Sequence, residues 1–385
     1  MNDSRPRVAI VNDQPRSSGT GTYAWHLAGL LARSPEVVAD HIFLDYPGGR
    51  ILRNPGTPDQ SVLASVGRVP LADSRPWFWR RAMRHVRGYD IVHFTSQNMS
   101  FLCGAAPAGS VVTCLDVIPL VEPEGLFERY WRGYLYSGLR RAGRIIAISE
   151  ATKRDVMRLF GVPGDRIAVV PLGVDADYRP RDQVTARERL GLPRDRKIVL
   201  HVGTAAARKR VPLLLEAFAA SRSCRDALLV RIGQAPAGHR ALAQRLGIGE
   251  RVLFLENVPG ETLPQYYSAA DLFVFPSRYE GFGLPPLEAM ASGCPVIAAD
   301  NSSIPEVMGD AAVLVASDDP QTWADEIDRV LGDRTVSDTM ARRGLARAAA
   351  FTWLRTAERT VEEYRSAVLG KRKSRLTSSG AGCRM

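Results

Sequence analysis

Residues 276–293 read PSRYEGFGLPPLEAMASG and follow the apolar run Leu272–Phe275. The stretch places Glu280 in a turn rich in Gly and Pro, and it places a second acid, Glu288, inside a predicted helix start. A strand, a turn and a helix in this order are typical of a ligand site at the carboxyl end of a parallel strand. The stretch therefore predicts an α/β fold with two acids beside a ligand, whereas a pair of unrelated surface acids would be the plain alternative.

The same block closely resembles the Glu-x7-Glu motif of the family 4 retaining glycosyltransferases, and the resemblance extends over about residues 8–365. In that family the first Glu faces the donor sugar and the second holds the ribose of the nucleotide, so these roles are expected of Glu280 and Glu288. The turn between the two acids is expected to belong to the donor site as well, through Gly281, Phe282, Gly283 and Leu284.

The composition is that of a folded protein with two domains, because the 385 residues are 45% hydrophobic and 24% charged. No run approaches the ~20 uninterrupted apolar residues that a membrane-spanning helix needs. The chain start leads into the strand-like run Val8–Val11 without the pattern of a signal peptide, so a cytoplasmic protein is expected. The five scattered cysteines include no Cys-x-x-Cys pair and are expected to be reduced and mostly buried.

The formal net charge of +10 comes mainly from Arg. This balance favours anionic partners, such as nucleotide diphosphates, acidic membrane surfaces or nucleic acid. Neither a zinc knuckle nor aromatic-rich RNA-binding strands are recognisable, so nucleic acid is not expected. A GC-rich genome would explain many of the arginines equally well.

Short apolar runs alternate with helical patterns along the chain, which predicts two doubly wound units with parallel sheets. The strand candidates of the first half are Val8–Val11, His41–Leu44, Ile91–Phe94, Val111–Cys114 and Ile145–Ile148. Those of the second half are Ile198–Val202, Leu228–Ile232, Val252–Leu255, Leu272–Phe275 and Val296–Ala298.

The polar run Asp175–Asp182 marks the expected boundary between an acceptor-binding domain (1–175) and a nucleotide-sugar-binding domain (176–351). The resemblance implies the GT-B architecture, in which two Rossmann-like domains face each other across a cleft. It also implies that a last helix, here residues 352–369, returns to the first domain. Residues 370–385 are expected to form a disordered basic tail.

A departing diphosphate gathers negative charge, so a donor site needs cations or backbone N–H groups placed in advance. Gly203 follows a predicted strand, and Arg208 and Lys209 precede the next predicted helix. Helix N-termini and paired cations both favour phosphate, although a solvated surface pair is the alternative for an isolated Arg-Lys. In the resembled family the matching pair grips the pyrophosphate without a metal. Hence no metal and no cofactor is expected besides the donor, GDP-mannose or a UDP-sugar.

The segment Ser18–Tyr23 joins the first predicted strand to the first predicted helix. It resembles the Gly-rich loop of the family, with Gly19 and Gly21 at the matching glycines. The resemblance implies a backbone that approaches the phosphate and the reacting sugar, which only small residues permit. A plain turn is the alternative. Farther along the chain, Ser149 is predicted to be the N-cap of a helix.

The chain departs from the family pattern at Leu115, where family members commonly carry a His before the Asp that is retained here as Asp116. A leucine can neither hydrogen-bond a sugar hydroxyl nor share a proton. Either the His is dispensable for this acceptor, or activity is altered or lost. His93, at the end of another predicted strand, is the candidate to take over part of that role, with a hydrogen-bonded core histidine as an equal alternative.

The resemblance implies hexosyl transfer with retention by front-face attack, in which the leaving phosphate accepts the acceptor's proton. Such a reaction needs no pair of acid and base carboxylates, unlike glycoside hydrolysis. Glu280 is expected to position the sugar and to form the catalytic set with Asp116, Arg208 and Lys209. The rival hypothesis is a nucleotide-sugar-binding protein with weak or no transfer activity.

Residues 75–87, RPWFWRRAMRHVR, are predicted to form a helix with apolar and arginine stripes. Basic amphipathic helices with Trp often lie on anionic membranes, although packing on its own domain is the favoured alternative. A membrane contact would point to a lipid-carried or glycan acceptor. Otherwise a small soluble metabolite is the more natural acceptor.

Overall fold

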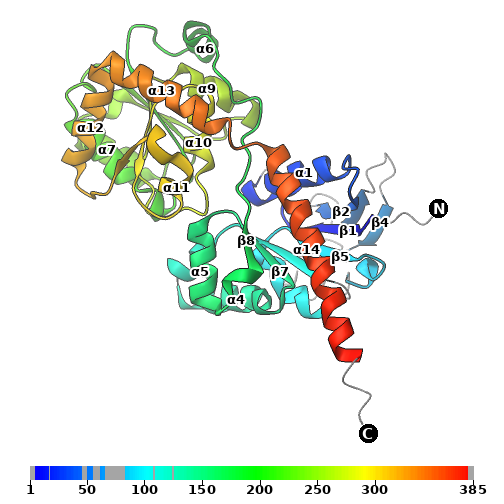
Figure 1. Cartoon of the computed structure of the whole chain (residues 1–385). Helices are drawn as coiled ribbons and strands as arrows, with labels where there is room; N and C mark the ends of the chain where they lie inside the picture. The colour runs from blue at the N-terminus through cyan, green and yellow to red at the C-terminus, as the bar shows by residue number, and fades with distance from the viewer. Residues whose placement is uncertain are drawn as a thin grey trace. The chain divides into compact units, whose positions relative to one another are not determined.

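The computed structural model of the chain describes residues 5–16, 18–45, 50–54, 61–65, 83–106, 109–123 and 125–379. It divides into two compact units, each with its own sheet (Figure 1). Unit 1 comprises residues 1–173 and 353–385, and unit 2 comprises residues 174–352. Among the described helices, none has the length and apolar character that crossing a membrane requires.

Unit 1 is built on an eight-stranded sheet of order β4-β3-β2-β1-β5-β6-β7-β8. Its strands are β1 (Arg7–Asn12), β2 (Val38–Asp45), β3 (Arg50–Asn54), β4 (Ser61–Ser65), β5 (Ile91–Phe94), β6 (Gly109–Cys114), β7 (Arg144–Ala147) and β8 (Ile167–Val169). Neighbouring strands from β2 to β8 are parallel, and β5 is buried along its whole length, because the sheet is covered on both faces.

The sheet of unit 1 departs from the predicted parallel arrangement at one edge. There β3 pairs antiparallel with β2, and β4 pairs antiparallel with β3. Both strands have only five residues, and β3 is rich in polar residues, which suits an edge hairpin and gives little apolar signal.

The helices of unit 1 cover the sheet, and α14 contacts α1, β5, β6 and β7. They are α1 (Gly19–Leu31), η2 (Met83–Val86), η3 (Gln97–Ala105), α3 (Ile118–Val121), α4 (Leu126–Tyr136), η4 (Ser137–Arg141), α5 (Glu150–Phe160), η5 (Gly164–Arg166) and α14 (Trp353–Ser379). The prediction that Ser149 caps a helix is confirmed, since its Oγ accepts a hydrogen bond of 3.0 Å from the N–H of Thr152 at the start of α5.

Two expectations for unit 1 concern segments at the limits of the described residues. A basic helix was predicted at residues 75–87, and residues 75–82 of this stretch lie outside the described residues. Within the described part, Met83 and Val86 of η2 are buried in the core. The disordered tail expected from residue 370 is wrong for 370–379, because α14 continues to Ser379. That stretch contains neither Gly nor Pro after residue 370, so no helix breaker interrupts it.

Unit 2 contains a six-stranded sheet, parallel throughout, of order β11-β10-β9-β12-β13-β14. Its strands are β9 (Ile198–Val202), β10 (Leu228–Ile232), β11 (Val252–Leu255), β12 (Leu272–Phe275), β13 (Val296–Ala299) and β14 (Val313–Val315). The chain adds strands on one side of β9 first, β10 and then β11, and afterwards on its other side, β12, β13 and β14. In such a sheet ligands bind beside the carboxyl ends of the strands where the order reverses, here β9 and β12.

The helices of unit 2 follow its strands in the alternating manner of a doubly wound fold. They are α6 (Gln183–Leu190), η6 (Ala207–Lys209), α7 (Val211–Ala220), α8 (Ala237–Arg245), η7 (Gly249–Arg251), η8 (Gly260–Thr262), α9 (Leu263–Ala269), α10 (Leu284–Ala291), α11 (Ile304–Met308), η9 (Gly309–Ala311), α12 (Pro320–Gly332) and α13 (Arg334–Ala348).

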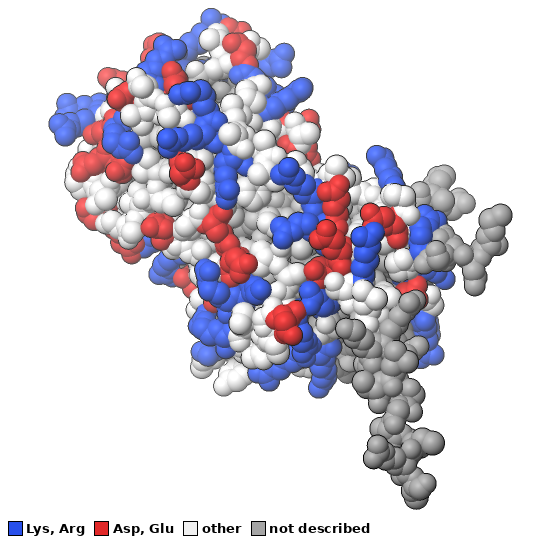
Figure 2. Space-filling model, in the orientation of Figure 1, with Lys and Arg blue, Asp and Glu red and all other residues white. Residues whose placement is uncertain are grey.

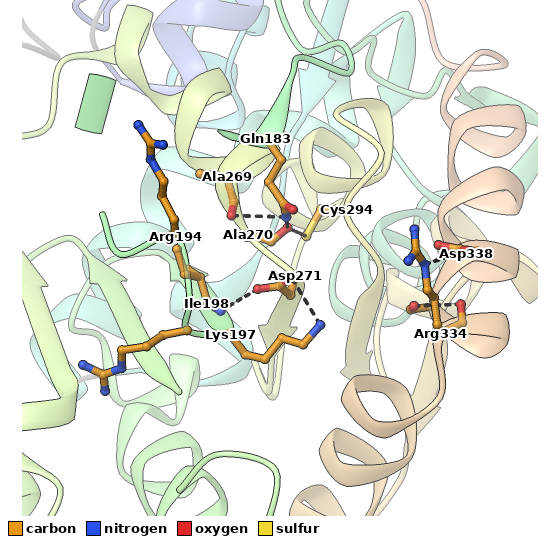
Figure 3. A network of polar contacts seen from close by, with 12 residues as sticks. Gln183, Arg194, Lys197, Ile198, Ala269, Ala270, Asp271, Cys294, Arg334 and Asp338 are labelled. Atoms are coloured by element: carbon orange, nitrogen blue, oxygen red, sulfur yellow. Dashed lines mark hydrogen bonds and ion pairs between the residues drawn. The ribbon is translucent and has the colours of Figure 1, made fainter. Parts of the chain in front are cut away.

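Asp271 ties the amino ends of β9 and β12 together (Figure 3). Its Oδ2 accepts hydrogen bonds from the N–H of Ile198 at 2.6 Å and from Arg187 Nη2 of α6 at 2.7 Å. Gln183, also on α6, donates to the carbonyl oxygens of Ala269 and Ala270. The amino ends of the two central strands are therefore anchored by one carboxylate, and their carboxyl ends are left to the loops of the candidate site.

Candidate functional site

Three charged side chains meet at the carboxyl ends of β9 and β12. Arg208 and Lys209 lie in η6, in the loop that follows β9, and Glu280 lies in the turn that follows β12. Glu280 Oε1 lies 2.5 Å from Lys209 Nζ and 3.1 Å from Arg208 Nη1. The structure thus brings together three of the predicted site residues, separated by about 70 positions in the sequence.

The site is buried and has an excess of positive charge. Lys209 and Glu280 are buried and Arg208 is half-buried, with two cations sharing one carboxylate. Burial lowers the pKa of the Lys209 ammonium, the adjacent Glu280 carboxylate opposes this shift, and Arg208 adds to it. A second anion would relieve the repulsion between the two cations, so the arrangement favours binding of a phosphate.

Serine hydroxyls fix the position of Glu280. Ser277 Oγ hydrogen-bonds Glu280 Oε1, the N–H of Glu280 donates to Ser302 Oγ at 2.9 Å, and Ser303 Oγ donates to the carbonyl of Glu280 at 3.0 Å. Ser302 adopts a left-handed φ of 47°, which is unusual for a residue with a side chain. The carboxylate is therefore held in one orientation before any ligand binds.

Glu288 lies in the middle of α10 and is half-buried. Its Oε2 accepts a hydrogen bond of 2.9 Å from the hydroxyl of Tyr267, and Tyr178 also hydrogen-bonds the carboxyl. Burial raises the pKa of Glu288 to about 7, although the two tyrosines oppose the shift. The carboxyl is therefore poised to change charge near neutral pH when a ligand supplies or removes hydrogen bonds.

The turn between the two acids is shaped by Gly283, which caps α10 with a φ of 103°. A Cβ at this glycine would lie 2.6 Å from Ile304 Cδ1. Phe282 is buried and its ring lies edge-on to Phe351 at 5.8 Å, so it packs within unit 2. Gly281 is also buried, and Leu284 is the first residue of α10.

The loops after β9 and β10 are joined by residues that the sequence did not indicate as part of the site. A Cβ on Gly233, whose φ is 122°, would lie 1.9 Å from the carbonyl oxygen of Gly203. Arg231, fully buried on β10, donates to the carbonyl of Thr204 at 3.0 Å and to that of Ile232. The only available signal was an arginine inside an otherwise apolar strand.

His201, at the end of β9, is fully buried between these loops and the cation pair. Neither of its ring nitrogens has a hydrogen-bond partner among the described residues. Burial, together with Arg231 and Lys209, holds its pKa well below the usual range, so the ring is neutral. Its position explains the glycine at 203, where a Cβ would lie 3.3 Å from His201 Cε1.

In unit 1, Gly19 and Gly21 form the first turn of α1 rather than an open loop. Ser18 caps this turn, since its Oγ accepts a hydrogen bond of 3.0 Å from the N–H of Gly21. A Cβ on Gly21 would lie 1.8 Å from the carbonyl oxygen of Pro15, whereas the space beside Gly19 is open. Gly21 is thus required for local packing, and Gly19 is the one that leaves room for a ligand.

The acceptor-side role considered for His93 is not supported. His93 is fully buried, with Nδ1 2.7 Å from the Tyr364 hydroxyl and Nε2 2.8 Å from Thr113 Oγ1. Thr113 Oγ1 also lies 2.8 Å from the Tyr23 hydroxyl. Burial lowers the pKa of His93 to about 3. The residue therefore belongs to a core polar network that joins β5, β6, α1 and α14.

Leu115 and Asp116 follow β6 directly. Leu115 is buried, and its N–H donates to Gln97 Oε1 at 3.1 Å. Asp116 is half-buried, and its Oδ1 accepts a hydrogen bond of 3.1 Å from the N–H of Ile118 at the start of α3. Over the described ranges, no group of three or more His, Cys, Asp or Glu is placed to hold a metal ion.

Two family models match this chain, one for each half. Residues 182–347 match the model described as Glycosyl transferases group 1, and residues 17–178 match the model described as Glycosyltransferase Family 4.

Curated relatives include the D-inositol 3-phosphate glycosyltransferase of Nocardia farcinica, which is 40% identical over 258 residues, 63% of this chain. The O-antigen chain mannosyltransferase B of Escherichia coli is 33% identical over 271 residues, 66% of this chain. The match spans 57% of the length of the first relative and 68% of the second.

Solved structures of similar fold include sucrose-phosphate synthase from Thermosynechococcus elongatus, with a TM-score of 0.78 and 24% identity over 94% of this chain and 99% of that one. Another is HepE of Anabaena in complex with UDP and glucose, with a TM-score of 0.73 and 18% identity over 94% of this chain and 100% of that one. The likeness confirms the expected fold, GT-B with two Rossmann-like α/β units.

Proposed function

Because the chain belongs to glycosyltransferase family 4, we propose that it transfers a hexosyl group from a nucleoside diphosphate sugar to a hydroxyl acceptor, with retention of configuration. One observation carries this proposal. At the carboxyl ends of β9 and β12, the cations Arg208 and Lys209 both contact the same carboxylate oxygen, Glu280 Oε1. That combination suits a ligand with a diphosphate at one end and sugar hydroxyls at the other.

In the proposed complex, Arg208 and Lys209 bind the diphosphate. The glycosidic bond breaks with a growing negative charge on the leaving phosphate, and cations fixed beforehand stabilise that charge without reorganising during the reaction. Burial of Lys209 strengthens this effect, because charge interactions are stronger where water is excluded. We propose that these two cations take the place of a divalent metal in donor binding.

Glu280 is proposed to orient the sugar rather than to attack it. Its Oε1 receives hydrogen bonds from Lys209, Arg208 and Ser277, and so many donors make a carboxylate a weak nucleophile. The acceptor hydroxyl then attacks the face that the phosphate leaves, and its proton passes to the departing phosphate oxygen. The new glycosidic bond forms on the side of the broken one, which retains the configuration.

Glu288 is proposed to accept hydrogen bonds from the ribose hydroxyls. Its pKa of about 7 means that ionisation near neutral pH is easily shifted by a ligand. Ribose hydroxyls would donate to the ionised carboxylate and favour that form. The tyrosines that already bind the carboxyl, Tyr267 and Tyr178, fix its orientation.

The names of the relatives narrow the donor and acceptor. One relative is named for inositol 3-phosphate and one for mannosyl transfer, and the HepE structure contains UDP with glucose. We propose a hexose donor carrying GDP or UDP, GDP-mannose being the first to try. For the acceptor, a glycan, a lipid-carried intermediate and a polyol phosphate or other small metabolite are the classes to compare.

The test is transfer from GDP-mannose, UDP-glucose and their relatives to a panel of polyol phosphates and oligosaccharides, with and without EDTA. Nuclear magnetic resonance of the product gives its anomeric configuration. We expect diphosphate release that depends on acceptor, persists in EDTA and gives a retained linkage. An inverted product, or a strict need for Mg²⁺, would contradict the proposed mechanism.

A second candidate function follows from Leu115, whose buried side chain contributes no polar group after β6. Under this alternative the chain binds a nucleotide sugar but transfers it weakly or not at all. The two are separated by following donor turnover in water, because a pure binder releases no free sugar. If Leu115→His raises transfer or hydrolysis, the alternative is favoured; an unchanged rate shows that the missing His does not limit the enzyme.

A further inference from the structure

Helix α4 of unit 1 carries four exposed large side chains, which we name the α4 stripe: Leu126, Phe127, Tyr130 and Tyr134. The first three are 74–78% exposed and Tyr134 is 42% exposed. Elsewhere in the described part of the chain, exposed large hydrophobic residues lie singly. A contiguous cluster of exposed apolar side chains is typical of a surface that binds a protein, a ligand or a membrane.

The α4 stripe is a second apolar face of this helix. Leu135 and Tyr136 are buried in the core of unit 1, and Trp131 packs against that core. At 100° per residue, Leu126, Phe127, Tyr130 and Tyr134 fall within about a quarter of the helix circumference, on the side away from Leu135. The helix therefore needs no further burial to fold, and the stripe remains for a partner.

Aromatic stacking holds the end of the stripe in place. The Tyr134 ring stacks on Trp131 at 5.7 Å and on Phe101 of η3 at 5.9 Å. Tyr130, by contrast, is 77% exposed. Tyrosine has an apolar ring and a polar tip, a combination suited to the boundary between acyl chains and lipid headgroups.

Arginines outnumber acids along α4 and the helical turn η4 that follows it. From Leu126 to Arg141 the chain has one acid, Glu128, and four arginines: Arg129, Arg132, Arg140 and Arg141. Figure 2 shows Lys and Arg prominent among the charged side chains over the part of unit 1 that holds α4 and α5. A second copy docked on the same stripe would bring like charges together, whereas an anionic bilayer supplies the complementary charge.

We propose that the α4 stripe binds the surface of a bilayer containing anionic lipids, with Phe127 and Tyr130 at the boundary of headgroups and acyl chains and Arg129 near lipid phosphates. The binding free energy has two contributions, the burial of apolar side chains and the attraction between opposite charges. The proposal goes beyond sugar transfer and uses residues of unit 1 only, so it stands or falls separately from the donor site in unit 2.

The test is co-sedimentation of the full chain with vesicles of phosphatidylcholine alone, and of phosphatidylcholine and phosphatidylglycerol in equal parts. We expect the wild type to bind the anionic vesicles and to remain in solution with the neutral ones. The double variant Phe127→Ser/Tyr130→Ser should bind the anionic vesicles at least about tenfold more weakly, since two apolar anchors are lost. Arg129→Gln should weaken binding about fivefold, the effect expected for one basic residue near the surface.

Matched variants separate a lipid surface from a general loss of structure. Leu354→Ser removes an exposed apolar side chain of the same unit from α14, where its exposure is 58%, and should leave vesicle binding unchanged. Phe127→Trp/Tyr130→Trp should retain binding, because indole also favours the headgroup boundary. Equal melting temperatures of all variants show that they fold.

Three results would overturn the proposal. In the first, the wild type fails to sediment with anionic vesicles. In the second, Phe127→Ser/Tyr130→Ser binds as tightly as the wild type. In the third, the wild type forms a dimer without lipid that this double variant abolishes, which would assign the α4 stripe to a second copy of the chain.

Discussion

At the scale of single residues, Glu280 combines two properties that are separable by mutation. It neutralises part of the charge of Arg208 and Lys209, and it presents a carboxylate where the donor sugar is proposed to bind. We predict that Glu280→Gln lowers kcat by about 10²–10³ and leaves diphosphate affinity equal or higher, because the cations keep their charge. The control is Glu256→Gln, an exposed acid of the same unit paired with Arg240, which should change neither quantity. Normal turnover by the Glu280 variant would refute its assignment.

Glu288 should show a pH-dependent effect on stability. Its folded pKa of about 7 lies above its ordinary value of 4.5, so the folded protein holds this proton more tightly than the unfolded chain does. The associated stabilisation is complete below about pH 4.5 and is lost as the pH rises through 7. We predict that Glu288→Gln matches the wild type at pH 4 and exceeds its free energy of unfolding by about 1–3 kcal/mol at pH 8.

The same variant should bind the nucleoside diphosphate more weakly, by about 1–3 kcal/mol, since it loses charged hydrogen bonds to ribose. Urea unfolding at the two pH values, combined with titration of the ligand, checks both effects. A variant that gains stability at pH 8 and binds the nucleotide as before would remove Glu288 from the donor site.

The sequence could indicate the site through Glu280 and Glu288 because both lie in one local motif with a strong family resemblance. It could not indicate Arg231 or Gly233 in the same way. Their importance comes from contacts between loops that are far apart in the sequence, such as Arg231 with Thr204. For His93 the sequence left an acceptor-side role and a hydrogen-bonded core histidine equally open. Its strand position could be predicted, whereas its burial, which favours the core histidine, could not.

At the scale of elements, the loops after β9 and β10 approach each other at Gly203 and Gly233. We predict that Gly233→Ala destabilises unit 2 by about 2–4 kcal/mol, because its φ of 122° and the 1.9 Å approach of a Cβ to the Gly203 carbonyl exclude a side chain. Gly238→Ala, in the first turn of α8 with open space around it, should be neutral or stabilising by about 0.5–1 kcal/mol. Thermal unfolding of both variants tests this prediction. Equal melting temperatures would show that the two loops can separate freely.

Asp271 supports the site from the other end of the strands. We predict that Asp271→Asn lowers the free energy of unfolding by about 2–4 kcal/mol, because buried Arg187 loses its charged partner. Asp338→Asn, which removes an exposed pair with Arg334 shown in the same view (Figure 3), should change it by less than about 0.5 kcal/mol. Urea unfolding curves measure both, and a neutral Asp271 variant would show that α6 is held by its other contacts.

Strand prediction succeeded for the apolar runs of β9 to β12, whose bounds were all predicted correctly. Three of these strands, β9, β10 and β12, are buried along nearly their whole length. Strand prediction failed for β8 and β14, which have three residues each, and for β3 and β4 at the sheet edge. Short and half-polar strands depend on pairing with neighbours, which leaves little periodic signal in the sequence.

At the scale of the whole molecule, the charged residues proposed to bind the diphosphate and ribose, Arg208, Lys209 and Glu288, lie in unit 2, and Leu115, which departs from the family pattern, lies in unit 1. Donor binding and acceptor choice are therefore expected to respond to different mutations. The family motif and the strand alternation predicted the fold class, since both units have the layered α/β arrangement. The acceptor could not be predicted in this way, because the loops of unit 1 carry no comparable motif.

The central claim is that the cations after β9 form a diphosphate site, and calorimetric titration tests it most directly. The protein would be titrated with GDP, UDP, ADP and dTDP in EDTA and again with Mg²⁺, using wild type, Lys209→Met and Lys197→Met. Lys197 precedes the amino end of β9 and is 56% exposed, so it is the matched control, a lysine of the same unit outside the proposed site. We predict that one diphosphate binds without metal, that Lys209→Met weakens it by about 2–3 kcal/mol, and that Lys197→Met does not. Equal affinity of wild type and Lys209→Met, or no binding of any diphosphate, would contradict the account.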